Sequence, residues 1–273
     1  MSRPSPAIDP GLARRRFARA AGTYGDASRL EAEVASRMLE RLDLVRLAPR
    51  RILDAGSGPP QRALSRRYAG AQVIALDFAA EMLAAPGFGW FRKQPQPVCA
   101  DLAALPFTAD SIDLAWSSMV MHWIAEPLAA LRELHRVLAP EGLLMFSTLG
   151  PDTLKELRAA AGESRVHAFI DMHDLGDMLV ACGFSAPVMD MEVLTVAYRS
   201  PDALLEDLRR SGQTSARADR PRGLAGRHFA ERLRGALGAA PRATFEVVYG
   251  HAWKSAPRAP EAAKAIRFQR RIS

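Results

Sequence analysis

Short apolar runs that alternate with helical segments constrain the fold of this 273-residue chain more than any other feature. Arg51 to Asp54 ends at Gly56 and Gly58, as a buried parallel strand does when it turns into a helix. Gln72 to Asp77 repeats the pattern. Three further strands are expected at residues 97–100, 112–116 and 143–147, and helices at residues 79–85 and 128–138. This alternation implies right-handed βαβ crossovers, so residues 48–148 are predicted to form a wound core with a parallel sheet.

Two more strands are expected in the second half of the chain, which brings the predicted sheet to seven strands. They span residues 188–198 and 243–253, and a helix at residues 174–182 ends at Gly183. Two insertions start or return near the carboxyl ends of strands, where open α/β sheets bind ligands. Residues 149–172 are expected to be irregular, and residues 199–241 to hold helices at 202–211 and 226–238. The chain is therefore predicted to be a doubly wound α/β protein with a mostly parallel sheet and a helical substrate lid.

Both ends of the chain lie outside this core. Leu30, Val34, Met38 and Leu42 recur at helical spacing and predict a helix over residues 26–44, within an N-terminal helical segment that spans residues 1–47. The preceding basic stretch, residues 11–24, is interrupted by Gly22. The main domain is predicted to span residues 48–253. The last residues, 254–273, have no apolar pattern and are expected to form a mobile basic tail.

Composition excludes several classes of protein. No apolar run approaches the roughly 18 to 20 residues that cross a bilayer, and the first ten residues lack a signal-peptide core, so we expect a soluble, cytoplasmic protein without membrane contact. Cys99 and Cys182 lie far apart, which argues against a disulfide framework or a zinc site. A formal net charge of +7 favours an acidic partner.

The glycine turn after the first predicted strand indicates a ligand site for a nucleoside. Gly56 and Gly58 let a ligand approach the backbone closely. A dinucleotide-binding turn would need a third glycine where Gln61 stands, and Pro59 and Pro60 remove two backbone N–H groups that could hold phosphate. The turn therefore favours a nucleoside that carries no phosphate.

Acidic side chains at neighbouring strand ends support this interpretation. Asp77 ends the second strand, where a carboxylate accepts hydrogen bonds from both ribose hydroxyls, and Asp101 follows the third strand, where it can meet an adenine amino group. With Asp54 they place three acids around one crevice, which suits a sulfonium cation. The alternative is that each acid caps a helix or a turn. The predicted cofactor site is completed by Phe78, Met82, Leu102 and Ser117.

These motifs resemble those of class I methyltransferases, which use S-adenosyl-L-methionine. The resemblance rests on D-A-G-S-G (54–58), A-L-D-F (75–78) and D-L-A-A-L-P-F-x-x-x-S-I-D-L-A-W-S-S (101–118), about 100 residues in all. Pro60 departs from the pattern, because it stands where a glycine is usual. The resemblance implies a Rossmann-like fold that binds S-adenosyl-L-methionine at the glycine turn.

A closer resemblance covers nearly the whole chain. Residues 17–24 (F-x-R-A-A-x-x-Y), 147–149 with 154–157, and 243–249 (A-T-F-E-V-V-Y) look like the malonyl-carrier-protein O-methyltransferases of biotin biosynthesis. That family methylates the free carboxyl of a malonyl thioester, so the resemblance implies malonyl-loaded acyl carrier protein (malonyl-ACP) or malonyl-CoA as the substrate. His122-Trp123, residues 151–154 and residues 171–175 fit equally well a neighbouring family, the complex I assembly proteins thought to hydroxylate an arginine.

The chemistry of carboxyl methylation fits the residues available. A malonyl carboxylate is already ionised at pH 7, so its attack on a methyl group needs no general base. It does need a donor that orients it, and Tyr24, His122 and Arg199 are the candidate catalytic residues. The open alternatives are a packing role for Tyr24, a helix-start role for His122 and a solvated surface charge for Arg199.

The remaining polar clusters concern partners and metals. The arginines of the second insertion are candidates for docking an acidic carrier protein, although a solvated helix face explains them equally well. They are Arg209, Arg210, Arg217, Arg220 and Arg222. No metal site is predicted from His167, Asp171, His173 and Asp174, because their spacing matches no common site and Asp171 suits a helix N-cap. A non-catalytic or RNA-directed binding protein ranks last, since only charge supports it.

Overall fold

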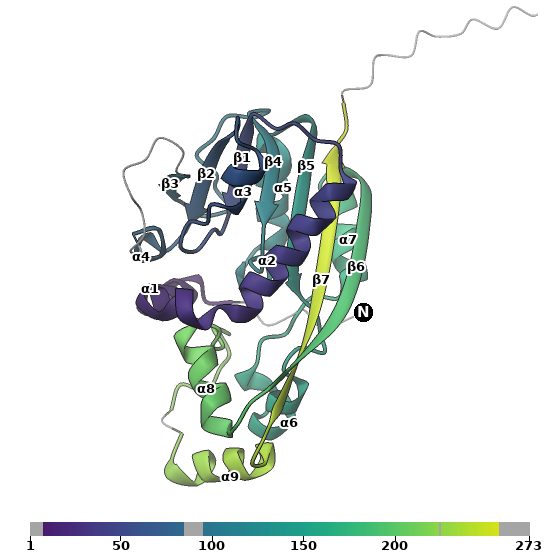
Figure 1. Ribbon diagram of the computed structural model, residues 1–273. Helices are drawn as coiled ribbons and strands as arrows, with labels where there is room; N and C mark the ends of the chain where they lie inside the picture. Colours follow the sequence, from purple (N-terminus) through teal and green to yellow (C-terminus); the bar gives the residue numbers. More distant parts are fainter. Residues whose placement is uncertain (1–7, 85–94, 224, 257–273) are drawn as a thin grey trace, which may run out of the picture.

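A computed structural model describes residues 8–84, 95–223 and 225–256. One seven-stranded sheet has the order β3-β2-β1-β4-β5-β7-β6 (Figure 1). The first five strands of the chain pair in parallel, and β7 is antiparallel to both β5 and β6. The strands are β1 (Arg51–Ala55), β2 (Gln72–Asp77), β3 (Gln96–Cys99), β4 (Ile112–Ser117), β5 (Leu138–Leu149), β6 (Phe184–Ala197) and β7 (Arg242–Lys254). The predicted fold class is confirmed.

Helices cover both faces of the sheet, as a doubly wound fold requires (Figure 1). Helix α2 crosses one face, where Val34, Met38 and Leu42 join a buried cluster with side chains of β1, β4 and β5. Helices α5 and α7 cover the other face and share a second cluster with the opposite side chains of the same strands. The helices are α1 (Pro10–Ala27), α2 (Arg29–Arg41), α3 (Ala63–Arg67), α4 (Ala80–Leu83), α5 (Pro127–Val137), α6 (Lys155–Ala161), α7 (Met172–Ala181), α8 (Pro201–Arg210) and α9 (Arg227–Leu237).

The N-terminal segment differs from the prediction. A single helix was expected over residues 26–44, but α1 precedes it, runs through Gly22 without a break, and gives way to α2 only at Ser28. Asp9 caps α1 by accepting a hydrogen bond from the Leu12 N–H at 2.9 Å, and Pro10 occupies the first turn. Packing of Ala13, Phe17 and Ala20 outweighs the low helix propensity of the glycines.

The first insertion also differs from the prediction. Residues 149–172 were expected to be irregular, yet they contain α6 and a short 3₁₀ turn, Glu163–Arg165. The start of α7 agrees with the prediction, because Asp171 caps it through the His173 N–H at 2.8 Å. Gly183 follows α7 with φ +93°, a left-handed conformation that glycine adopts without strain.

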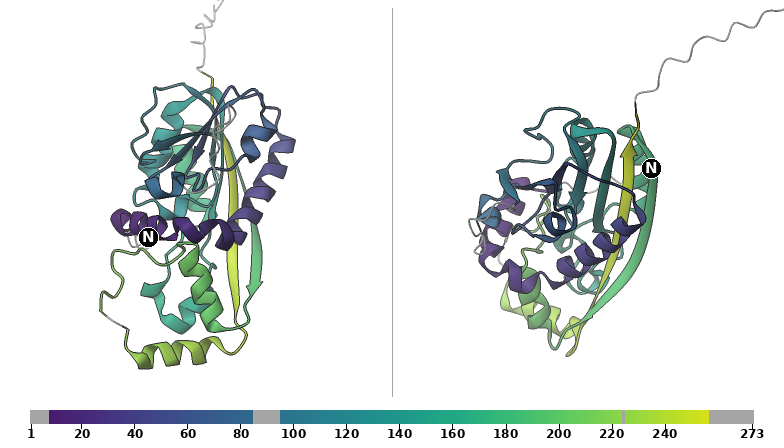
Figure 2. Two further views of the ribbon diagram at one scale, coloured as in Figure 1. Left: turned by 60° about the vertical axis from the view of Figure 1, so that its left-hand side comes forward. Right: turned by 45° about the horizontal axis from the view of Figure 1, so that its top comes forward.

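The two insertions pack against each other beyond one end of the sheet. Strands β6 and β7 extend past the parallel strands, α8 and α9 lie between them in the chain, and α6 contacts α9 (Figure 1). Leu204, Leu208 and Leu233 share a buried cluster with Leu157 and Phe245. Figure 2 shows α1 lying between this helical group and the sheet. No helix within the described ranges is long and apolar enough to span a membrane. Of the predicted basic tail, residues 257–273 lie outside the described residues, and Lys254 belongs to β7.

Candidate active site

The turn after β1 is built so that only glycine fits at its first position. The N–H groups of Gly56 and Ser57 both donate to the Leu76 carbonyl, at 2.7 and 2.9 Å, which ties the turn to β2. Gly56 has φ +79°, and a Cβ there would lie 2.4 Å from Val120 Cγ2. Gly58 has φ +58°, but a Cβ there would meet only Met82 and Tyr24, at 3.4 and 3.6 Å. Gly58 therefore leaves room toward these two side chains.

Asp77 holds this turn in place from the end of β2. Its carboxylate accepts hydrogen bonds from the Gly58 N–H at 3.0 Å and the Ala79 N–H at 2.9 Å. Burial raises the pKa of Asp77 to about 6, although these backbone N–H groups favour the ionised form. Each carboxylate oxygen keeps a further lone pair for a ligand.

A cavity of about 250 Å³ opens beside this turn. Eight of the predicted site residues line it, namely Tyr24, Gly56, Gly58, Asp77, Phe78, Met82, Asp101 and Leu102. The wall also includes one further acid, Glu126, and the aromatic side chains of Phe17 and Trp123, and none of the described lining residues is lysine or arginine. A cavity with three acids and no cation suits a positively charged, phosphate-free ligand and not a nucleotide. S-adenosylmethionine, a sulfonium cation, fits this donor set.

Two predicted cofactor residues lie behind the cavity wall. Asp54 is 5% exposed and is absent from the lining, and burial together with the nearby Asp77 raises its pKa to about 7. Ser117 is fully buried and its Oγ has no hydrogen-bond partner among the described residues, whereas the next residue, Ser118, lines the cavity. Met119 follows with φ +59° and donates its N–H to Ser147 Oγ at 3.0 Å. The serine that lines the cavity is therefore Ser118, one residue after the predicted Ser117.

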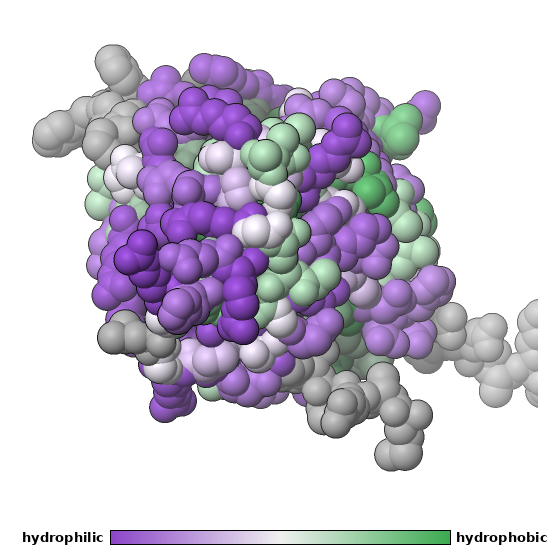
Figure 3. All heavy atoms as spheres, turned by 90° about the horizontal axis from the view of Figure 1, so that it is seen from below, coloured by the Kyte–Doolittle hydropathy of each residue, from purple (hydrophilic) through white to green (hydrophobic). Residues whose placement is uncertain are grey.

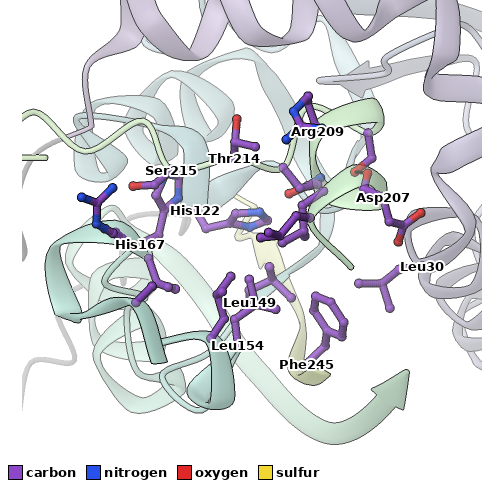
Figure 4. A pocket seen from close by; sticks show the side chains of 18 of the residues that line it. Leu30, His122, Leu149, Leu154, His167, Asp207, Arg209, Thr214, Ser215 and Phe245 are labelled. Carbon is purple, nitrogen blue, oxygen red and sulfur yellow. Dashed lines mark hydrogen bonds between the residues drawn. The ribbon is translucent and has the colours of Figure 1, made fainter. Parts of the chain in front are cut away.

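A second cavity, of about 240 Å³, adjoins the first, and the two share Trp123 and Gln213. Its walls come from α2, α6, α8, α9 and the ends of β5 and β7, and they are mainly apolar. They include Leu30, Leu149, Leu154, Leu157, Leu205, Leu208, Phe229, Leu233 and Phe245. In Figure 4 the His122 ring lies in the middle of this cavity.

Three residues that line this second cavity each carry a buried polar atom with no hydrogen-bond partner in the described part of the chain. The atoms are His122 Nε2, Trp123 Nε1 and Ser215 Oγ. His122 Nδ1 lies 3.2 Å from Thr148 Oγ1, and burial, with a contribution from His167, lowers the pKa of His122 well below its usual range, so the ring is neutral. An unsatisfied buried polar group is costly. These atoms are therefore candidates for contacts with a polar ligand.

The three predicted catalytic residues are not brought together. Tyr24 lines the first cavity and His122 the second, while Arg199 is exposed and lines neither. The guanidinium groups that do line the second cavity belong to Arg165, which lies over the Phe229 ring at 4.0 Å, and to Arg209, which pairs with Glu206 at 2.7 Å. The structure thus gives no support to a role for Arg199 at either cavity.

The residues weighed as metal ligands have other partners. His167 Nε2 accepts a hydrogen bond from the Ala216 N–H at 2.7 Å, and Asp171 caps α7 and contacts His173 Nδ1 at 2.8 Å. Within the described ranges, no group of three or more His, Cys, Asp and Glu side chains is placed to hold a metal ion.

Sequence reasoning missed several residues at the junction of the two cavities. Trp123 ends a short 3₁₀ helix, Met121–Trp123, whereas Gln213 and Ser215 stand in a loop, and no periodicity reveals the course of either segment. Glu31 is different, because it falls on the same helical face as Val34 and Met38, which are fully buried. An acid within an apolar stripe was a signal that could have identified it.

Comparison with known proteins identifies the family. Residues 53–146 match a family model described as "Methyltransferase domain". The chain is 48% identical to a protein of Methylovorus sp. (strain MP688), over 97% of each chain, and 47% identical to one of Gallionella capsiferriformans (strain ES-2), over 95% of this chain and 96% of that one. Both relatives are named "Malonyl-[acyl-carrier protein] O-methyltransferase".

Solved structures agree on the fold. The YcgJ protein of Bacillus subtilis superposes with a TM-score of 0.58 at 17% identity, over 81% of this chain and all of that one. A putative methyltransferase of Bacillus halodurans superposes with a TM-score of 0.57 at 16% identity, over 80% of this chain and 99% of that one. The chain therefore belongs to the malonyl-[acyl-carrier protein] O-methyltransferase family, whose members are S-adenosylmethionine-dependent methyltransferases.

Proposed function

We propose that this protein methylates the free carboxylate of a malonyl thioester carried by acyl carrier protein, in the cytoplasm, at the start of biotin synthesis. The observation that carries the proposal is that an acid-lined cavity and a mainly apolar cavity meet at Trp123 and Gln213, and that residues lining the apolar cavity carry unpaired buried polar atoms. The names of the relatives supply the malonyl carrier as the substrate class.

The first cavity has the groups that S-adenosylmethionine requires. Asp77 is the acceptor for the ribose hydroxyls, Gly58 allows the close approach of the ligand, and Asp101 faces the adenine end. The cofactor supplies an electrophilic methyl group. Tyr24 closes the side of the cavity formed by α1, where it lies near Gly58.

The second cavity has the groups that a carboxylate nucleophile requires. The Trp123 indole N–H and the Ser215 hydroxyl are donors, and the neutral His122 ring donates from Nε2 when Thr148 donates to Nδ1. A carboxylate needs no base, so these residues only orient it and keep water out. Because a carboxylate and a sulfonium neutralise each other as the oxygen–carbon bond forms and the carbon–sulfur bond breaks, a dry, apolar site favours the reaction.

The helices of the two insertions offer a surface for an acidic carrier protein. The face seen from the side of α9 is mainly hydrophilic (Figure 3), and α9 contributes the exposed Arg227, Arg232 and Arg234. Arg217, one of the predicted docking residues, has a different role, because it is 7% exposed, pairs with Asp219 at 2.7 Å and donates to the Val166 carbonyl. We therefore assign docking to the exposed arginines and a structural role to Arg217.

The test is methyl transfer from S-adenosylmethionine with a labelled methyl group. We expect malonyl-ACP to gain the label as a base-labile ester, malonyl-CoA to react less well, and acetyl-ACP, which lacks the free carboxyl, to gain none. Label on acetyl-ACP, or on neither malonyl substrate, would refute the proposal. An oxygen-dependent product with one added oxygen atom would instead support the arginine hydroxylase alternative.

A further inference from the structure

Glu31 is a buried acid that the methyl-transfer chemistry described above does not use. It stands in the first turn of α2, is 9% exposed, and lines the second cavity. Its helical face is otherwise apolar, with Val34 and Met38 fully buried. A carboxyl group in such a position is costly unless it is neutral or paired.

The one hydrogen bond that a side chain makes with Glu31, among the described residues, comes from Gln213. Gln213 Nε2 donates to Glu31 Oε1 at 2.7 Å. No ion pair in the described ranges includes Glu31. Because Gln213 lines both cavities, this pair places Glu31 near their junction, where methyl donor and acceptor meet. The other carboxyl oxygen, Oε2, is not held by any described side chain.

The charged surroundings of Glu31 disfavour its ionised form. Asp207 on α8 and Tyr24 on α1 interact with it, and Asp207 raises its pKa. Burial is the larger cause, and it raises the pKa of Glu31 to about 7, although hydrogen bonds from its own backbone N–H and from Gln213 favour the ionised form. The other titratable or charged groups that line the same cavity are His122, Arg165, His167, Tyr198 and Arg209. Both histidines are neutral, and the two arginines have partners of their own, Phe229 and Glu206.

The entering substrate adds a second carboxyl group to this small cavity. An ionised Glu31 would repel a malonyl carboxylate, whereas a neutral Glu31 would donate its O–H to it in a charge-assisted hydrogen bond. Two carboxyl groups that share one proton are favoured over two anions at close range.

We propose that Glu31 binds the malonyl carboxylate as a neutral acid, donating its O–H to a carboxylate oxygen while Gln213 holds its other oxygen. The inference rests on the proposed function and names the group that recognises the substrate's charge. It also predicts tighter binding of substrate than of product, since the methyl ester is uncharged and is a weaker acceptor.

This role gives the enzyme a specific pH dependence. The neutral fraction of Glu31 is about one half at pH 7, about a tenth at pH 8 and about a hundredth at pH 9, so kcat/KM for malonyl-ACP falls in the same proportion. Binding above pH 7 also takes up a proton, because the complex contains the neutral acid.

The experiment compares wild type, Glu31→Gln and Glu31→Leu at saturating S-adenosylmethionine from pH 6.5 to 9. Gln keeps a donor without a titrating group, so we expect kcat/KM within about threefold of wild type at pH 7 and no loss above it. Leu keeps the volume but removes the donor, so its KM should be at least tenfold above that of Glu31→Gln at every pH, while S-adenosylmethionine affinity is unchanged. Glu33→Gln is the matched control: Glu33 stands on the same helix, is exposed and pairs with Arg37, and this variant should keep the wild-type profile.

Parallel pH profiles for wild type and Glu31→Gln would overturn the inference, as would equal KM values for the Gln and Leu variants. Proton uptake gives a second readout that needs no turnover. It is measured by calorimetry of malonyl-ACP binding to the S-adenosylhomocysteine complex at pH 8 in buffers of different ionisation enthalpy. Uptake that persists in Glu31→Gln refutes the role of Glu31, and the absence of any malonyl-ACP binding refutes it as well. Binding without methylation by wild type refutes the proposed function alone.

Discussion

Lowering the pH should weaken the binding of S-adenosylmethionine through Asp77. The ribose hydroxyls donate to the ionised carboxylate, whereas burial raises the pKa of that group in the free protein to about 6. A carboxyl group with a raised pKa is neutral below that pH, so binding must then expel its proton. Affinity is therefore constant above about pH 7 and falls as the pH drops through 6.

The magnitude follows from that one group. The apparent dissociation constant rises by the factor 1 + 10^(pKa − pH), which with a pKa of about 6 is close to 1 at pH 8 and about 11 at pH 5. The loss of affinity is thus about tenfold, or about 1.4 kcal/mol. Asp54 does not line the cavity, so its ionisation is not required. If Asp54 had to ionise as well, its pKa of about 7 would make the loss about a thousandfold.

Calorimetric titration with S-adenosylmethionine at pH 5, 6, 7 and 8 measures this effect, with circular dichroism as a check on the fold at each pH. Asp77→Asn should bind at least tenfold more weakly at pH 8, and its affinity should not depend on pH in this range. Asp54→Asn should keep the wild-type pH dependence. A flat wild-type profile would refute the ribose contact, and a thousandfold loss would show that both acids contact the cofactor.

Two further predictions concern the turn and the second cavity. Gly56→Ala should lower the free energy of unfolding by about 2 to 5 kcal/mol in urea denaturation, because φ is +79° and the new Cβ lies 2.4 Å from Val120. Gly58→Ala, whose new Cβ has no contact closer than 3.4 Å, should lower it by only about 1 to 2 kcal/mol. Equal losses for the two variants would contradict this reasoning. Ser215→Ala should lower kcat/KM for malonyl-ACP about tenfold without changing S-adenosylmethionine affinity, since its Oγ has no partner among the described residues. The control is Ser111→Ala, directly before β4, which should change neither kcat/KM nor S-adenosylmethionine affinity. If Ser215→Ala also leaves kcat/KM unchanged, the Ser215 hydroxyl does not contact the substrate.

The sheet could be predicted from the sequence because its signals are local, and the same signals selected eight residues that line one cavity. The turn after β1 and the acid at the end of β2 can each be recognised from a short apolar run followed by glycine or aspartate. Strand β2 has the predicted limits. Ser117 shows that such local signals do not determine which of two neighbouring residues lines the cavity. Successive residues of a strand face opposite sides, so at the end of β4 the predicted Ser117 is buried, whereas the next residue, Ser118, lines the cavity.

The second cavity could not be predicted in the same way. Its walls come from α2, both insertions and the end of β7, which tertiary packing alone brings together. Helix α1 was missed because Gly22 suggests a break, whereas Phe17 packs edge-on against Trp123 at 4.9 Å between ring centroids and stabilises the helix. Arg199 was selected for its position at the start of an insertion, and the course of that insertion leaves it exposed.

We propose that a methyl donor and a malonyl carboxylate meet where the two cavities share Trp123 and Gln213. The most direct test is a crystal structure of the protein with S-adenosylhomocysteine and a malonyl-pantetheine amide. We expect the ribose on Asp77 and a carboxylate oxygen beside Trp123, about 3 to 3.5 Å from the position of the transferred methyl carbon. Adenosine bound away from the glycine turn, or a malonyl group outside the second cavity, would contradict the account.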